Sequence, residues 1–64
     1  MTFWQLIQGL KSGRPVTLQT ANGPIRGAFV LAVAAEDGTR QSWNVTYYLE
    51  PDGREHTVHL RTVD

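Results

Sequence analysis

The chain has 64 residues, no cysteine, and six Lys and Arg residues balanced by six Asp and Glu, so its formal net charge at pH 7 is zero. That length allows a single domain, 1–64, and the absence of cysteine excludes disulfides, thiolate metal sites and cysteine nucleophiles. The balanced charge argues against a strong nonspecific binder of duplex DNA, because such proteins carry a basic excess. A chain this small buries only about 60% of its unfolded surface, so small domains are often stabilised by disulfides, metals or oligomerisation. Without cysteine, self-association is the remaining way to add stability.

The N-terminal segment MTFWQLIQGL lacks the pattern of a secretory signal. Glutamines interrupt its apolar positions and no basic segment precedes them. No stretch of the chain reaches the ~18 apolar residues that a membrane span needs. We therefore expect a cytoplasmic protein with no membrane partner.

Residues 2–12 are predicted to form a short helix. Four apolar side chains recur at helical spacing on one face: Phe3, Leu6, Ile7 and Leu10. Thr2 and Gln5 fit a capping box at its start, and Gly13 is suited to the left-handed conformation that ends a helix. Gly9 is expected to weaken the segment by ~1 kcal/mol relative to alanine, so the helix should lie against a sheet.

The rest of the chain carries the signals of β-hairpins. Turn sequences at 21–24, 36–39 and 51–53 each contain Asn-Gly or Asp-Gly. They separate four predicted strands, at about 15–21, 25–35, 40–50 and 54–63.

Alternation of side chains assigns faces to these strands. In the first strand Val16 and Leu18 should face inward. In the third strand the inward face holds Trp43, Val45, Tyr47 and Leu49. In the last strand a bend or a break is expected between Val58 and Leu60.

The second strand, IRGAFVLAVAAE, is apolar on both faces. One predicted face holds Ile25, Phe29, Leu31 and Val33, and the other holds Ala28, Val30, Ala32 and Ala34. Such a strand either bends so that its halves serve two layers, or covers its second face with the helix or another subunit. Gly27 is the natural point for the bend. The expected fold is mainly β, a small, strongly bent antiparallel barrel of four to five strands with an N-terminal α-helix.

The order of these elements resembles the Sm-like family, including the bacterial host-factor RNA chaperones. The resemblance is carried by the segment Pro15-Val16-Thr17-Leu18, the Asn22-Gly23 turn, Gly27 and the closing TVHLRTVD. It implies a ring of six or seven subunits that pair the edges of their last two strands. It also implies that the ring surfaces bind single-stranded RNA rich in uridine or adenine.

Five residues are candidates for contact with an RNA strand: Tyr48, Arg40, Arg26, Arg61 and His59. Tyr48 lies on the opposite face of its strand from Trp43 and Tyr47, which are expected in the core. Its ring is either a platform for base stacking or a surface residue suited to a strand. The arginines form either a weak basic surface or ordinary solvated charge beside acidic neighbours. Trp4 lies off the apolar face of the helix and either covers an end of the barrel or marks a contact with a partner.

Catalytic and metal chemistry find little support in the sequence. His56 and His59 are three residues apart, which in a strand places them on opposite faces, so they do not share a metal. Ser12 and Ser42 belong to no histidine–acid arrangement. We predict no enzyme activity, no cofactor and no metal.

Two functions follow from these features. The first is a self-associating Sm-like module that binds single-stranded RNA. The alternative is an SH3-like protein-interaction or accessory domain that binds no nucleic acid, and that docks its alanine-rich strand face or its helix on a protein partner.

Overall fold

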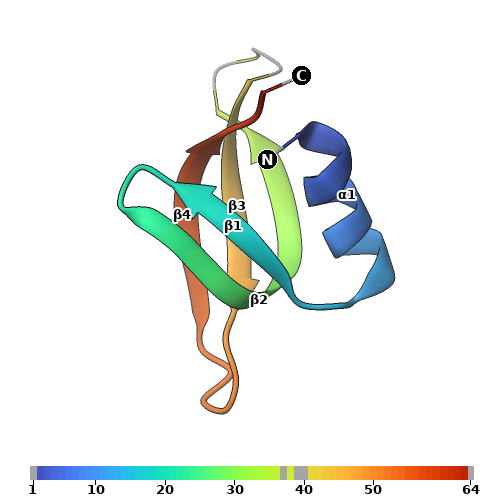
Figure 1. Ribbon diagram of the computed structural model, residues 1–64, viewed down its shortest axis with the longest axis vertical. Helices are drawn as coiled ribbons and strands as arrows, with labels where there is room; N and C mark the ends of the chain where they lie inside the picture. The colour runs from blue at the N-terminus through green and yellow to red at the C-terminus, as the bar shows by residue number, and fades with distance from the viewer. Residues whose placement is uncertain (1, 37, 39–40, 64) are drawn as a thin grey trace.

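The computed structural model describes residues 2–36, 38 and 41–63. Its elements are, in chain order, α1 (Phe3–Ser12), β1 (Val16–Thr20), β2 (Gly23–Ala35), β3 (Ser42–Tyr48) and β4 (Glu55–Arg61). The strands form one antiparallel sheet in the order β1-β2-β3-β4, with α1 beside it (Figure 1). No ladder joins β1 to β4 in the described part of the chain, so hydrogen bonding does not close the sheet. The mainly β class and the N-terminal helix are confirmed, and closure into a barrel stays a prediction.

Helix α1 is bounded by the signals expected from the sequence. The Thr2 backbone N–H donates to Gln5 Oε1 at 2.9 Å, and the Gln5 N–H donates to Thr2 Oγ1 at 3.2 Å, which completes the capping box. Gly13 ends the helix in the left-handed conformation. Leu6 and Gly9 are the buried residues of the helix, and they fix the face that packs on the sheet.

Strand boundaries differ from the predicted ones by up to two residues at the described ends. β2 begins at Gly23 because its pairing with Thr20 starts directly at the turn. β3 ends at Tyr48, since the segment after it folds into a turn in which the Gly53 N–H donates to the Leu49 carbonyl at 3.0 Å. The predicted start of this strand, residue 40, lies outside the described residues.

The two halves of β2 serve different parts of the sheet. Residues 23–28 pair with β1, and residues 29–35 pair with β3. In Figure 1 the first half forms a hairpin with β1 that crosses in front of β3 and β4. The long strand thus pairs with a different neighbour in each half, and a division between two layers of a barrel stays a prediction.

Two β-bulges interrupt the pairing of β2 with its neighbours. Thr17 of β1 is opposed by both Arg26 and Gly27, because the register passes from Val16↔Ala28 to Leu18↔Ile25. A second shift lies between Val30 and Ala32, which leaves Leu31 without a partner in the ladder. Each bulge inserts one residue into the strand, and so it exchanges the side chains that face inward with those that face outward.

The continuous alternation predicted for 25–35 is therefore wrong. Ile25 and Val33 pack against the core, whereas Leu31 between them is 43% exposed. Ala28 and Val30, assigned to the other face, are buried.

Gly27 is the position at which the first bulge depends on glycine. Its φ is +74°, a left-handed conformation that costs other L-residues about 1–2 kcal/mol. We expect Gly27→Ala to lower the free energy of unfolding by that amount in a urea titration. Gly27→Asn should recover part of the loss, because asparagine tolerates this region better than alanine. Equal losses in the two variants would contradict a conformational cause, since no atom outside the adjacent residues lies within 4 Å of a Cβ built there.

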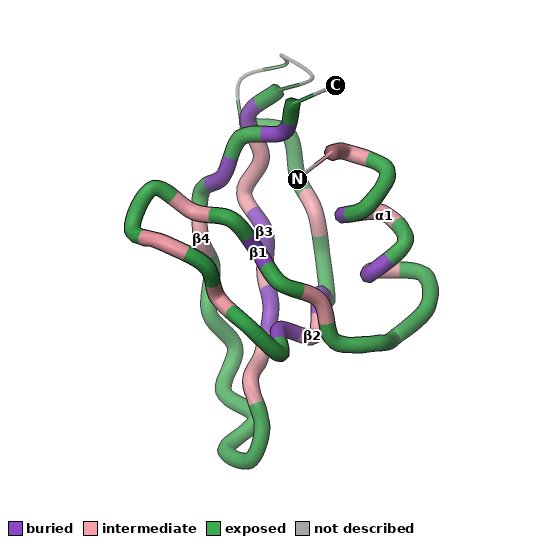
Figure 2. Tube along the Cα trace, viewed as in Figure 1, coloured by how far each residue is buried: buried purple, intermediate pink, exposed green. Residues whose placement is uncertain are grey.

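The core lies between the hairpin, the β2–β4 part of the sheet and α1 (Figure 2). Its buried hydrophobic residues are Leu6, Leu18, Ala28, Val30, Val45, Tyr47 and Leu60. Trp43 packs against this cluster, as expected, and its Nε1–H donates to Thr62 Oγ1 at 3.0 Å. The Phe3 ring stacks on Trp43 with a centroid separation of 4.8 Å, which ties the start of α1 to β3.

The break expected in the last strand is wrong. Val58 pairs with Val45 and Leu60 pairs with Trp43 in a register without a shift, and both side chains pack on the core. The physical reason is that positions two apart in a strand share a face.

Candidate functional site

Three of the five predicted RNA-contact residues share one surface. Tyr48, His59 and Arg61 alternate with core residues of β3 and β4, so they lie on the face of the sheet turned away from the core. We call this face of β2, β3 and β4 the outer sheet face. Arg26 lies in the β1–β2 hairpin, outside the β2–β4 part of the sheet, and Arg40 lies outside the described residues.

The Tyr48 ring packs against an aromatic neighbour on the same face. Its ring stacks on Phe29 of β2 with centroids 4.9 Å apart and planes 11° apart. The two residues are directly opposed in the register, and both are half-buried. One face of the tyrosine ring is thus already used for packing between strands.

His59 and Arg61 do not form a basic patch. His59 Nδ1 lies 2.5 Å from Glu36 Oε2, and both side chains are nearly half exposed. A phosphate approaching His59 would therefore meet the glutamate as well. Arg61 is exposed opposite Ser42, and Glu55 lies on the same face at the other end of β4. Between them the outer sheet face carries uncharged residues such as Ala32, Ala34, Thr46 and Thr57.

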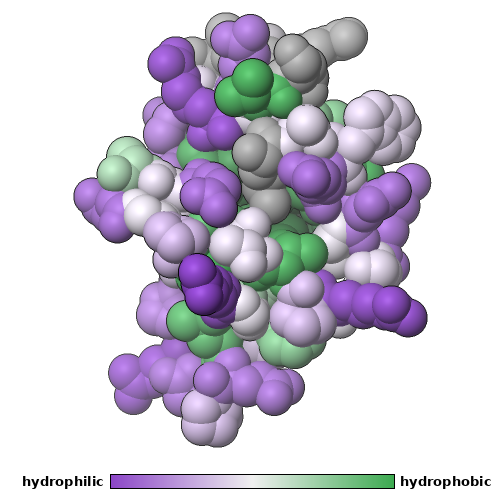
Figure 3. Space-filling model, in the orientation of Figure 1, coloured by the Kyte–Doolittle hydropathy of each residue, from purple (hydrophilic) through white to green (hydrophobic). Residues whose placement is uncertain are grey.

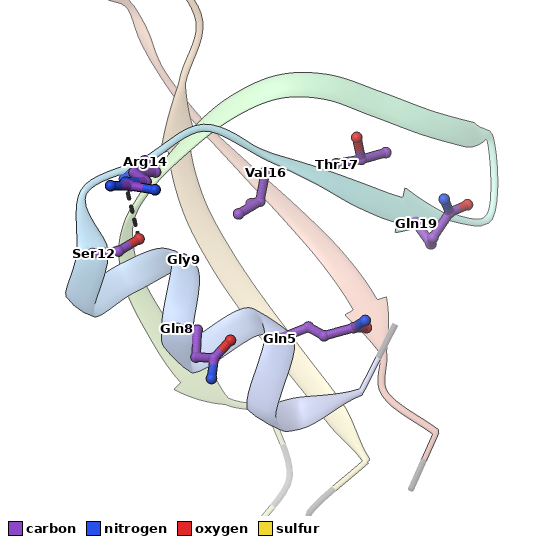
Figure 4. A pocket seen from close by; sticks show the side chains of 8 residues that line it. All are labelled: Gln5, Gln8, Gly9, Ser12, Arg14, Val16, Thr17 and Gln19. Atoms are coloured by element: carbon purple, nitrogen blue, oxygen red, sulfur yellow. Dashed lines mark hydrogen bonds between the residues drawn. The ribbon is translucent and has the colours of Figure 1, made fainter.

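A groove of about 550 Å³ lies between α1 and β1. Its volume falls within the range of small-molecule sites, ~300–1,000 Å³. The walls come from the helix, from the turn after it and from β1 (Figure 4). The lining residues are Gln5, Gln8, Gly9, Ser12, Arg14, Val16, Thr17 and Gln19.

Helix and strand approach each other closely at Gly9 and Val16 in this groove. A Cβ built on Gly9 would lie 2.8 Å from Val16 Cγ1, so only a glycine allows α1 to approach β1 this closely. The polar side chains that line the groove surround this contact between Gly9 and Val16. Figure 3 shows the side of the molecule that carries the hairpin and α1, where hydrophilic side chains surround separate, small apolar areas.

The lining of the groove has a distinct chemistry. It contains three carboxamides, two hydroxyls and one guanidinium, but no carboxylate. The carboxamides of Gln8 and Gln19 form no hydrogen bond with the described part of the chain, whereas Gln5 Oε1 accepts from the Thr2 backbone. A carboxamide both donates and accepts, so this set suits a ligand with neighbouring donors and acceptors, and Arg14 suits an anionic group beside it.

Arg14 has a second cation near it. Gln8, Lys11, Ser12 and Arg14 line a further hollow that adjoins the groove through shared residues. The Arg14 backbone N–H donates to Ser12 Oγ at 3.2 Å, which holds the turn between α1 and β1. The end of the groove nearest this turn is therefore its positive end.

Sequence reasoning did not find this groove. Part of the signal was present, because Thr17 and Gln19 are the outward positions of the first strand, and both are exposed. Gln5 and Gln8 are three apart on a helix, which places them on neighbouring positions of its surface. Only the docking of α1 against β1 brings these two polar rows together.

The described residues contain no group of three His, Asp or Glu side chains that could hold a metal ion. His56 and His59 lie on opposite faces of β4, as predicted: His56 is opposed to Tyr47, and His59 to Asn44. Trp4 is 69% exposed, so it does not cover an end of the sheet. No helix of residues 2–36, 38 and 41–63 has the length and apolar character needed to cross a membrane.

The groove and the outer sheet face are therefore two surfaces that could meet a ligand or a partner. The groove has the more specific chemistry, because its polar groups converge around a hollow. Comparison of the chain with models of protein families, with curated proteins and with solved structures finds no match.

Proposed function

We propose that this protein is a small, cytoplasmic binding module, not an enzyme, that holds a segment of single-stranded RNA in the groove between α1 and β1. The observation that carries the proposal is the lining of the groove, with carboxamides and hydroxyls beside Arg14 and no carboxylate. In this proposal the sheet belongs to the small Sm-like or SH3-like barrels that the sequence resembles.

The groove chemistry matches the parts of a nucleotide. A glutamine side chain can pair with the donor and acceptor pattern of a base edge, which is accessible in a single strand. A guanidinium pairs with phosphate in a fixed, bidentate geometry. The proposal therefore assigns base contacts to Gln8 and Gln19 and a phosphate contact to Arg14.

The zero net charge limits the strength of this binding. Arg14 and Lys11 together supply two phosphate contacts at the positive end of the groove. For single strands, log K falls with log salt at a slope of about −0.7 for each contact, so a slope near ~−1.4 is expected. A shallow salt dependence of this kind distinguishes the groove from an extended basic surface.

Arg14→Ala is expected to weaken RNA binding about fivefold to tenfold and to reduce the magnitude of the salt slope by ~0.7. The measurement is a filter-binding titration with oligo-U and oligo-A at two salt concentrations. Arg54→Ala is the matched control, because it removes the same charge from an exposed turn distant in sequence from the groove.

Arg61→Ala tests the outer sheet face in the same titration. A loss of binding in Arg61→Ala with none in Arg14→Ala would move the site to that face. Absence of binding of either RNA by the unmodified protein would refute the proposed function.

A protein-interaction module is the second candidate, and the outer sheet face favours it. Ala32 and Ala34 are exposed there, and Leu31, which precedes Ala32 at the bulge, is 43% exposed, so this part of β2 offers a neutral surface to a protein partner. This candidate predicts no salt-dependent RNA binding in the titration above.

A further inference from the structure

We propose that two copies of this chain join through the free edge of β4, antiparallel about a two-fold axis at Val58. β4 pairs with β3 along its whole length, and nothing in the described part of the chain pairs with its other edge. In Figure 1 it forms the outer side of the β2–β4 part of the sheet. An open edge offers a row of backbone donors and acceptors to another strand. The inference does not rest on RNA binding.

β4 lacks several of the devices that usually protect an edge, although it carries a charged residue at each end and β1 lies near it. It is seven residues long, EHTVHLR, with no proline, no lysine and no shift in its register. The other edge strand, β1, is five residues long, follows Pro15 and carries a register shift. Of the two edges, β4 is therefore the one better suited to pair with a further strand.

The charges at the two ends of β4 are complementary to those of a second, antiparallel copy of the strand. A two-fold axis at Val58 places Glu55 opposite the partner's Arg61, and Arg61 opposite the partner's Glu55. Directly opposed residues in an antiparallel pair share a face, and both of these side chains lie on the outer sheet face. Opposite charges in that position stabilise strand pairing.

Two further opposed pairs are compatible with the same axis. Thr57 lies opposite the partner's His59 on the outer sheet face, where a hydroxyl and an imidazole can form a hydrogen bond. On the inner face Val58, which is half-buried, lies opposite its own copy. All seven residues of β4 are paired in this register.

Neighbouring registers are less favourable. A slide by two residues in one direction places His59 opposite its own copy and separates Glu55 from Arg61. A slide in the other direction places Glu55 opposite the partner's His59 and leaves Arg61 beyond the end of the partner's strand. Slides by one residue are excluded, because they exchange the inner and outer faces.

The two charges cannot satisfy each other within one chain. Glu55 and Arg61 are at opposite ends of β4, and at ~3.3 Å per residue they are about 20 Å apart. If reversing both charges restores a dimer that one reversal has weakened, the restored attraction must therefore act between two chains.

The experiment measures the mass of the full chain by sedimentation equilibrium from micromolar to millimolar concentration. We expect a reversible change from the 7.2 kDa single chain to twice that mass. Glu55→Arg and Arg61→Glu should each weaken the dimer at least about tenfold, because each turns two attractive pairs into two repulsive ones. Circular dichroism of each variant checks that it folds.

Mixing the two variants is the decisive step. In a mixed dimer, the arginines at 55 and 61 of one chain face the glutamates at 61 and 55 of the other, so both pairs become attractive again. We expect the equimolar mixture to form a dimer under conditions in which each variant alone is a monomer. Glu50→Arg and Arg26→Glu are the matched controls, since they make the same charge changes at exposed positions outside β4.

Three results would overturn the proposal. They are a single-chain mass at every concentration, a dimer that is insensitive to both charge reversals, and a mass of six or seven chains, which would favour the ring that the Sm-like resemblance implies. RNA titration of Glu55→Arg keeps this test separate from the proposed function, because the groove lies on α1 and β1 and not on β4.

Discussion

Replacing Leu6 by alanine is expected to lower the free energy of unfolding by about 2–5 kcal/mol. Leu6 is fully buried, and it is the one large side chain that α1 buries completely in the core. A helix of ten residues is marginal in isolation, so it depends on this contact with the sheet. Because small domains have total stabilities near the low end of ~5–15 kcal/mol, the variant should lose a large share of its stability.

Urea unfolding followed by tryptophan fluorescence and by circular dichroism measures this loss. The Phe3 ring stacks on Trp43, so release of α1 should change the emission of Trp43 before the sheet unfolds. Ile7→Ala is the control, because Ile7 is only half-buried and does not belong to the core cluster. Its expected cost is about 1 kcal/mol or less. Similar losses in the two variants would show that Leu6 does not anchor the helix.

Gly9→Ala is expected to destabilise the protein by about 1–3 kcal/mol, although the same change on an exposed helix would stabilise it by ~1 kcal/mol. The added Cβ would lie 2.8 Å from Val16 Cγ1 and 3.3 Å from Val16 Cγ2. Valine has a stiff side chain with few alternative rotamers, so it cannot move aside without repacking. The sign of the effect therefore separates a packing role for Gly9 from a purely helical one.

A double-mutant cycle with Val16→Ala tests the cause. Removal of the Val16 methyl groups makes room for the new Cβ, so the double variant should lose less stability than the sum of the two single losses, by about 0.5–3 kcal/mol. Gln8→Ala is the control for helix propensity, since Gln8 is exposed. Additive losses, or a Gly9→Ala variant as stable as the unmodified protein, would contradict the close contact between α1 and β1.

The candidate site was harder to predict than the elements that form it. Tyr48 was correctly placed on the face away from the core, but its stacking on Phe29 depends on the register between β2 and β3. That register includes a bulge at Leu31 that no local signal marks. The groove likewise required the angle at which α1 meets β1, because its two polar rows are separate in sequence.

The sequence by itself determined what depends on residues within about four positions of each other. The Thr2–Gln5 capping box, the end of α1 at Gly13 and the inward face of β3 are of this kind, because local hydrogen bonds and side-chain alternation decide them. Only the tertiary structure decided the bulges of β2 and the contact of Gly9 with Val16. These arise from long-range packing, in which a strand must bend to cover a core built by residues distant in sequence.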